Sequence, residues 1–215
     1  MNELPRRERE KQIREEEITC AAEKLFCQKG FDETSMDEIA REAQFTKRTL
    51  YQYFTNKEDL FFAVVRRGFQ KLSAYLQADI QGQQNGYQKI QQSFKSCYRF
   101  YKDYPDMFRL ISYIGYVRQK SNDDSVRQRE FMQSNNELFF TVSRIFKEGQ
   151  ADGSVNPALD PDKTSLSLVF LISGFFNQLS TSGKTFTRHF SLDTEEFSLF
   201  TMDLLFNAIK QEKTQ

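Results

Sequence analysis

The sequence predicts an all-α protein of about nine helices. Nine Gly and four Pro in 215 residues is a low content of the residues that interrupt helices. Along most of the chain apolar residues recur at intervals of three and four, the spacing that places them on one face of a helix. With 39% hydrophobic and 28% charged residues, the chain has the composition of a globular protein that buries a core.

The composition disfavours an enzyme. His189 is the only histidine, the residue most used in acid–base catalysis, and neither a phosphate-binding glycine loop nor a zinc motif is present. Cys20, Cys27 and Cys97 are odd in number and lack the spacing of a disulfide framework, which is typical of a reducing cytoplasm. We therefore expect no catalytic residues, metal or cofactor. No apolar run reaches membrane-spanning length, so we expect a cytoplasmic protein that does not bind membranes.

The first helix is predicted between a charged beginning and Gly30. Basic and acidic residues alternate over residues 1–17, which is typical of a solvated helix with ion pairs between successive turns. One face of the helix then carries Ile18, Ala21, Ala22, Leu25 and Phe26. Gly30 tolerates the left-handed conformation that commonly follows a helix.

A short second helix and a tight turn are predicted next. Thr34 is expected to cap this helix. Asp37, three residues later, is expected to bond back to the N–H of Thr34, which would form a variant capping box. The core face of the helix is Met36, Ile39, Ala40 and Ala43. The following residues, Gln44-Phe45-Thr46, leave room only for a turn.

The third helix presents an unusual set of outward side chains. Thr46 is expected to cap it, and Leu50 and Phe54 point inward together because they are four residues apart. Outside remain two cations, a hydroxyl, a phenol and an amide: Lys47, Arg48, Thr49, Tyr51 and Gln52. These are the groups that hydrogen-bond to the phosphates and base edges of DNA.

Asn56 is expected to cap a long fourth helix that continues to about Asp79, which completes a helix-turn-helix arrangement. This region contains the segments Lys29-Gly-Phe31, Asp37-Glu-Ile-Ala40, Thr49-Leu-Tyr-Gln-Tyr-Phe54 and Lys57-Glu-Asp-Leu60. In this order and spacing, the segments resemble the TetR family of bacterial transcription regulators. The resemblance covers about residues 14–65.

The resemblance implies a DNA-binding regulator with a helix-turn-helix domain over residues 1–70 and a helical ligand-binding and dimerisation domain over residues 71–215. It implies a homodimer and a repressor that an unidentified small apolar or aromatic effector releases from a palindromic double-stranded DNA operator. The residues expected at the DNA are Thr34, Ser35, Thr46, Lys47, Arg48, Thr49, Tyr51, Gln52 and Lys57. The alternative is a helical ligand-binding or adaptor module without specific DNA recognition.

Two positions depart from the family's usual pattern. Gln44 stands where the family usually has Gly, and at a positive φ a Gln would cost up to about 1–2 kcal/mol. Arg48 stands where a small residue is frequent and would add a contact to guanine or phosphate.

The charge of this region is unusual for a DNA-binding domain. Residues 1–60 hold 11 Lys+Arg against 14 Asp+Glu, so DNA binding would depend on where the cations lie. Besides the favoured solvated helix, the arginines of residues 1–17 admit a second interpretation, an N-terminal arm that reaches DNA phosphates.

The remaining chain is predicted to form helices rich in aromatic residues. Pro105 should separate two helices, and the polar gap at residues 119–125 should precede another long one. A loop then ends at Asp160, the expected cap of the first of two apolar helices, at about residues 162–181 and 193–211.

Two functional surfaces are expected in this second part. A cavity for the effector would be lined by Tyr98, Tyr101, Phe108, Tyr113, Phe131, Phe139 and Phe170. For any single ring, ordinary core packing is the simpler interpretation. The resemblance implies that the last two helices pair with their copies in a four-helix interface, rather than merely closing their own core. This interface would contain Leu166, Val169, Phe170, Phe176, Phe197, Phe200, Leu204 and Leu205.

Overall fold

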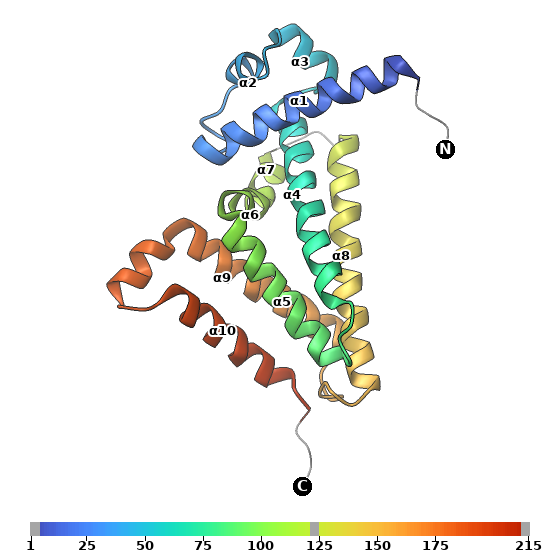
Figure 1. The fold of residues 1–215 in the computed structure, drawn as a ribbon, viewed down its shortest axis with the longest axis vertical. Helices are drawn as coiled ribbons and strands as arrows, with labels where there is room; N and C mark the ends of the chain where they lie inside the picture. The colour runs from blue at the N-terminus through green and yellow to red at the C-terminus, as the bar shows by residue number, and fades with distance from the viewer. Residues whose placement is uncertain (1–4, 121–124, 212–215) are drawn as a thin grey trace. The chain divides into compact units, whose positions relative to one another are not determined.

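The computed structural model describes residues 5–120 and 125–211, and these form an all-α fold (Figure 1). The helices are α1 (Arg6–Lys29), α2 (Met36–Glu42), α3 (Lys47–Tyr53), α4 (Lys57–Ile80), α5 (Gly86–Asp103), α6 (Pro105–Ser112), α7 (Ile114–Lys120), α8 (Val126–Ala151), α9 (Pro161–His189) and α10 (Thr194–Ile209). An isolated antiparallel bridge joins Val155 and Lys210. The all-α prediction is confirmed, and the described residues contain one helix more than expected because α7 was not foreseen.

Several helix boundaries lie where the local sequence predicts them. Thr46 accepts the N–H of Thr49 at 3.1 Å at the start of α3. Asp160 caps α9 in the same way, with Pro161 at the first helical position. Pro105 separates α5 from α6 as expected. Such caps satisfy N–H groups that a helix start leaves without an intrahelical partner.

Helix α9 is longer than the sequence pattern suggested, since it continues to His189 instead of ending near residue 181. Its second half is rich in Ser, Thr and Gly, which are weak helix formers. Several of these hydroxyls bond back to carbonyls one turn earlier, as Thr181 does to Asn177 and Thr187 does to Gly183. These bonds satisfy the hydroxyl groups within the helix, so the segment need not leave it.

The chain divides into two compact units. The first comprises Met1–Gly68 and Tyr113–Met132, and the second comprises Phe69–Ser112 and Gln133–Gln215. The sequence suggested a boundary near residue 70 and assigned everything after it to one domain. In the structure, α7 and the first turns of α8 instead group with the helix-turn-helix.

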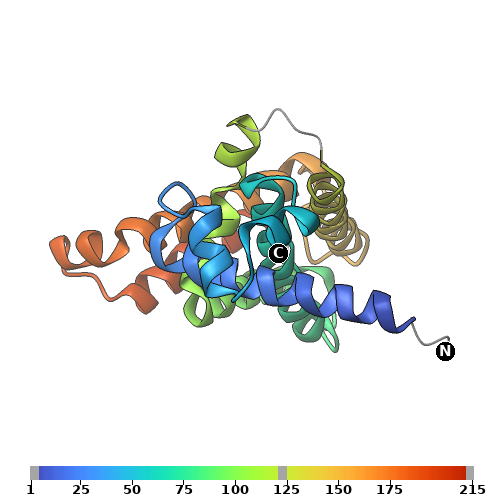
Figure 2. The ribbon, with the colours of Figure 1, turned by 90° about the horizontal axis from the view of Figure 1, so that it is seen from above.

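The first unit is built on an aromatic cluster. The rings of Phe26, Phe31 and Phe61 have centroids 5.0–5.7 Å apart, and Leu50 and Phe54 of the α3 region are also fully buried. Figure 2 shows the beginning of α1 extending past α2 and α3. The first buried residue of α1 is Ile18, so about three turns of this helix precede its core-forming part.

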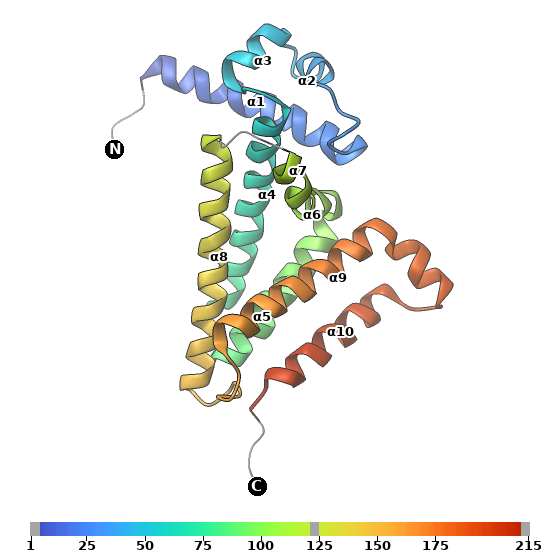
Figure 3. The same ribbon diagram turned by 180° about the vertical axis from the view of Figure 1, so that it is seen from behind.

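In the second unit, α9 and α10 lie side by side, joined at one end by the short connection before Asp193 (Figures 1 and 3). Phe206 of α10 packs on Phe94 of α5 with ring centroids 5.9 Å apart. Helices α5 and α8 meet through Gly86 and Gly149, where an added Cβ on Gly86 would overlap the backbone of Gly149. The Gly pair therefore permits a close approach that any larger residue would prevent.

Candidate nucleic-acid interface and ligand cavity

Helix α2 begins one residue later than the sequence suggested. Ser35, not Thr34, is the cap: its hydroxyl accepts the N–H of Glu38 at 3.2 Å, and the Glu38 carboxylate accepts the N–H of Ser35 at 3.0 Å. Hydrogen bonding to Lys29, followed by the bond from the Ser35 N–H, lowers the pKa of Glu38 to about 2. Thr34 is buried and its hydroxyl donates to the carbonyl of Gly30 at 2.7 Å, so this hydroxyl is turned away from any ligand.

The turn between α2 and α3 contains a residue with a positive φ at the position where the TetR family usually has Gly. Gln44 has φ 58°, in the left-handed region that favours Gly. Its side chain is exposed, and its backbone N–H bonds to the carbonyl of Arg41 at 3.1 Å. The turn therefore keeps a geometry suited to Gly while carrying a larger residue.

Helix α3 presents its polar side chains to solvent as predicted. Lys47, Arg48, Tyr51 and Gln52 are exposed and Thr49 is half-buried. The hydroxyls of Thr46 and Thr49 lie 2.8 Å apart.

The two cations of α3 differ in their partners. Lys47 pairs with Asp37 of α2 at 2.8 Å, and this hydrogen bond raises the pKa of Lys47. Arg48 forms no ion pair with any residue in the described part of the chain. Arg48 is therefore the cation of α3 whose charge no neighbouring carboxylate offsets.

Lys57, expected at a DNA phosphate, is engaged within the protein. Its ammonium donates to the carbonyls of Phe31 at 2.8 Å, Thr34 at 2.9 Å and Asp32 at 3.3 Å, and lies 4.3 Å from the centre of the Phe31 ring. An ammonium has three N–H donors, and all three are used. Lys57 therefore holds the loop between α1 and α2.

Arg127, which no sequence pattern singled out, completes the first unit from the start of α8. Its guanidinium bonds to Asp59 at 2.9 Å and to Glu15 at 2.8 Å, and lies 4.5 Å from the centre of the Phe54 ring. The Asp59 side chain is only 3% exposed. Because these partners are 68 and 112 residues away in the chain, no local pattern could reveal the cluster.

The second unit contains a cavity of about 370 Å³. Phe108, Phe139 and Phe170, three of the seven rings expected there, line it. No Asp, Glu, Lys or Arg is among the described residues that line it, and its polar groups include Asn135 and Asn177. Its chemistry suits an uncharged, largely apolar ligand.

The other four expected rings have different places. Tyr98 and Tyr101 stack against Phe176, with centroids 5.7 and 5.2 Å away, in an aromatic cluster of the second unit. Tyr113 and Phe131 belong to the first unit. There the Tyr113 hydroxyl donates to Asp32 at 2.5 Å and Phe131 packs on Phe62. An aromatic residue in a helix carries no sequence signal of whether it lines a cavity or fills a core.

Helices α9 and α10 carry a surface of exposed apolar side chains. Phe170 is 69%, Phe200 60% and Leu204 56% exposed, and Leu166 is also exposed. Val169, Phe197 and Leu205, also expected at a dimer interface, are half-buried. Phe176 is fully buried and belongs to the core of its own unit, which corrects its expected place at the interface.

Residues 5–120 and 125–211 contain neither a metal-binding cluster nor a membrane-spanning helix. No group of three or more His, Cys, Asp or Glu residues is placed to hold a metal ion there. Nor is any described helix both long and apolar enough to cross a bilayer.

Comparison with known proteins relates the helix-turn-helix to one family. A family model described as bacterial regulatory proteins of the tetR family matches residues 18–64. The transcriptional activator FasR of Mycolicibacterium smegmatis is 30% identical over 118 residues, which are 55% of this chain and 52% of FasR. The chain spans about half the length of the first curated relatives it matches.

Solved structures match over almost the whole chain. A TetR/AcrR-family regulator from Thermobifida fusca YX-ER1 is 25% identical, with a TM-score of 0.64 over 90% of this chain and 97% of that one. KstR2 of Mycobacterium tuberculosis, 17% identical, shares the fold with a TM-score of 0.68 over 93% of this chain and 96% of its own. The helix-turn-helix of this chain, residues 18–64, therefore matches the tetR family of bacterial regulatory proteins, and the described fold agrees with that of solved TetR-family regulators.

Proposed function

We propose that the protein is a homodimeric, sequence-specific DNA-binding regulator of transcription in the cytoplasm, a repressor that a neutral, largely apolar ligand releases from a palindromic operator. The observation that carries this proposal is the exposed polar face of α3, held by buried Leu50 and Phe54, behind a capped turn. Such a helix, fixed from within and polar outside, is suited to the major groove.

A side chain can contact DNA if it is exposed and is not already bonded to another part of the protein. Arg48 is placed to reach a guanine edge or a phosphate, because it is exposed and has no ion pair in the described chain. The other contacts would come from the exposed or half-buried polar residues Ser35, Thr46, Lys47, Thr49, Tyr51 and Gln52. Thr34 and Lys57 would support the interface from behind by fixing the loop before α2.

The dimer would form through the apolar surface of α9 and α10. Exposed rings such as Phe170 and Phe200 are costly in water and are typical of a surface that a partner covers. Two copies would place two α3 helices in successive major grooves about 34–36 Å apart. Phe200→Glu should convert the dimer to monomer in light scattering, whereas Phe140→Glu, at a position 73% exposed on α8, should not.

Binding of DNA is tested by selecting duplexes from a randomised library and measuring affinity at about 150 mM salt. Recovery of one palindromic sequence supports the proposal. A well-folded dimer that recovers none would favour the alternative, a helical ligand-binding or adaptor module.

Arg48→Ala should relax selection at one base position in each half-site. Equal weakening of all sequences would make Arg48 a phosphate contact only.

The ligand is tested with tryptophan, which the natural chain lacks. Phe139→Trp places a single reporter in the cavity wall, and Phe140→Trp places one on the exposed side of the same helix. Uncharged apolar compounds should change the emission of the first variant only and weaken operator binding, since a releasing ligand must prefer the state that does not bind DNA. Preferential binding of carboxylates would contradict the neutral assignment.

A further inference from the structure

Three cations near the beginning of α1 have no carboxylate partner in the described part of the chain. Arg7, Lys11 and Arg14 form no ion pair there, whereas Arg6 pairs with Glu10 at 2.9 Å. Their spacing of four and three residues puts all three on one face of the helix. We call them the α1 cation stripe.

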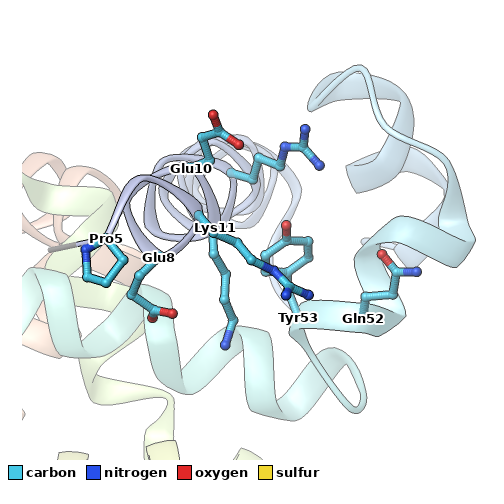
Figure 4. Close-up of a pocket in the computed structure, with 8 residues that line it drawn as sticks. Pro5, Glu8, Glu10, Lys11, Gln52 and Tyr53 are labelled. Carbon is cyan, nitrogen blue, oxygen red and sulfur yellow. The ribbon is translucent and has the colours of Figure 1, made fainter.

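The α1 cation stripe lies beside the end of α3. Arg7, Lys11 and Arg14 line an open hollow of about 700 Å³ together with Gln52 and Tyr53 from the last turn of α3. Figure 4 shows Lys11 on α1 at one side of this hollow and Gln52 on α3 at the other. The stripe therefore continues, on a second helix, the polar surface that α3 presents.

Two carboxylates share the hollow, and neither cancels the stripe. Glu10 is already engaged by Arg6. Glu8 lies in the first turn of α1, where a negative charge is stabilised by the helix dipole. The charge left without a counterion in the hollow is positive.

Packing does not explain why α1 begins so early. No residue from Arg6 to Arg14 is buried, so these turns add nothing to the core. From Arg7 to Arg14 the helix rises about 10.5 Å. At about 3.4 Å of DNA axis per phosphate on one strand, this rise covers about three intervals between phosphates, so the row is long enough to reach three phosphates of one strand.

We propose that Arg7, Lys11 and Arg14 bind the DNA backbone beside the half-site that α3 contacts, each neutralising one phosphate. The inference rests on the proposed function and extends it from the helix-turn-helix to a second element. The end of a recognition helix commonly faces the DNA backbone, which is the side on which the stripe lies. Phosphates are its proposed targets because the three cations lie in a row on α1, beside α3 rather than on the helix that is placed to read base edges.

The test compares the wild-type protein with Arg7→Gln/Lys11→Gln/Arg14→Gln on a duplex that the wild-type protein selects from a randomised library. Each lost phosphate contact lowers the slope of log affinity against log salt by about 0.9, so the triple variant should lose two to three units for each protomer, about 2.7 at full contact. Between about 50 and 200 mM salt, the wild-type affinity should fall about 40-fold more than that of the variant for each protomer. The base preferences should be unchanged.

A matched control removes three positive charges that lie outside the stripe. Arg9→Gln/Lys24→Gln/Arg188→Gln changes net charge equally but leaves the stripe and the Arg6–Glu10 pair intact, and it should keep most of the salt dependence. An equal loss in both variants, or no change in slope in the stripe variant, would overturn the proposal. So would altered base preferences, which would place the stripe in a groove. If the wild-type protein selects no sequence, the proposed function fails first, which is a separate result.

Discussion

Replacing Gln44 with Gly should stabilise the protein, because the turn before α3 keeps a left-handed residue. At φ 58° the Cβ of Gln44 crowds its own backbone, at a cost of about 1–2 kcal/mol. The side chain is exposed and forms no side-chain hydrogen bond within the described residues, so its removal loses no contact. The whole effect should therefore come from the backbone.

The expected gain is smaller than the strain because Gly also loosens the unfolded chain. That effect costs about 0.4–1 kcal/mol, which leaves a net gain of about 0.5–1 kcal/mol. For a chain of this size, such a gain raises the unfolding midpoint by about 1–4 °C.

Thermal and urea unfolding of three variants separate these contributions. Gln44→Gly should raise the midpoint, Gln44→Ala should leave it almost unchanged because Ala keeps the Cβ, and Glu42→Gly at the end of α2 should lower it. A Gln44→Gly midpoint at or below that of the Ala variant would refute the assignment of strain to this turn.

Three further outcomes are expected. Arg127→Met should lower the free energy of unfolding, measured in urea, by about 2–4 kcal/mol because it leaves the buried carboxylate of Asp59 without its cation. Adding Asp59→Asn should recover part of this loss, and additive effects of the two substitutions would contradict the pairing. Gly86→Ala should destabilise the protein by at least about 1–3 kcal/mol because the added Cβ overlaps the α8 backbone. Gly115→Ala, whose Cβ would meet no atom within 4 Å, should not destabilise it, and equal effects would contradict the close packing of α5 on α8. Hydrogen bonds from a lysine ammonium and a backbone N–H lower the pKa of Glu38 to about 2. The charged form of Glu38 should therefore stabilise the protein fully above the unfolded pKa near 4.5, and this stabilisation should be lost as the pH falls through about 2. An NMR titration midpoint near 4.5 would contradict those bonds.

Sequence reasoning succeeded where the cause was local. The cap at Thr46, the cap at Asp160 and the inward pair Leu50 and Phe54 depend on residues within one turn, and the structure confirms them. The cap of α2 was misplaced by one residue, because Thr34 and Ser35 are chemically equivalent candidates and only burial separates them.

The pattern could not anticipate contacts between distant segments. Lys57 resembled a phosphate contact at a helix start, but carbonyls more than 20 residues earlier in the chain occupy its ammonium. Tyr113 and Phe131 resembled cavity rings, but they bond to or pack within the first unit. Each outcome depends on which chain segments meet, and hydrophobic periodicity does not carry that information.

The first unit includes a second chain segment, residues 113–132, and this limits how its helix-turn-helix can be transplanted into another protein. A chimaera cut after Gly68 would discard Arg127 and leave Asp59 buried without its cation. A graft that exchanges operator specificity between relatives should therefore either retain the native residues 113–132 or remove the negative charge of Asp59.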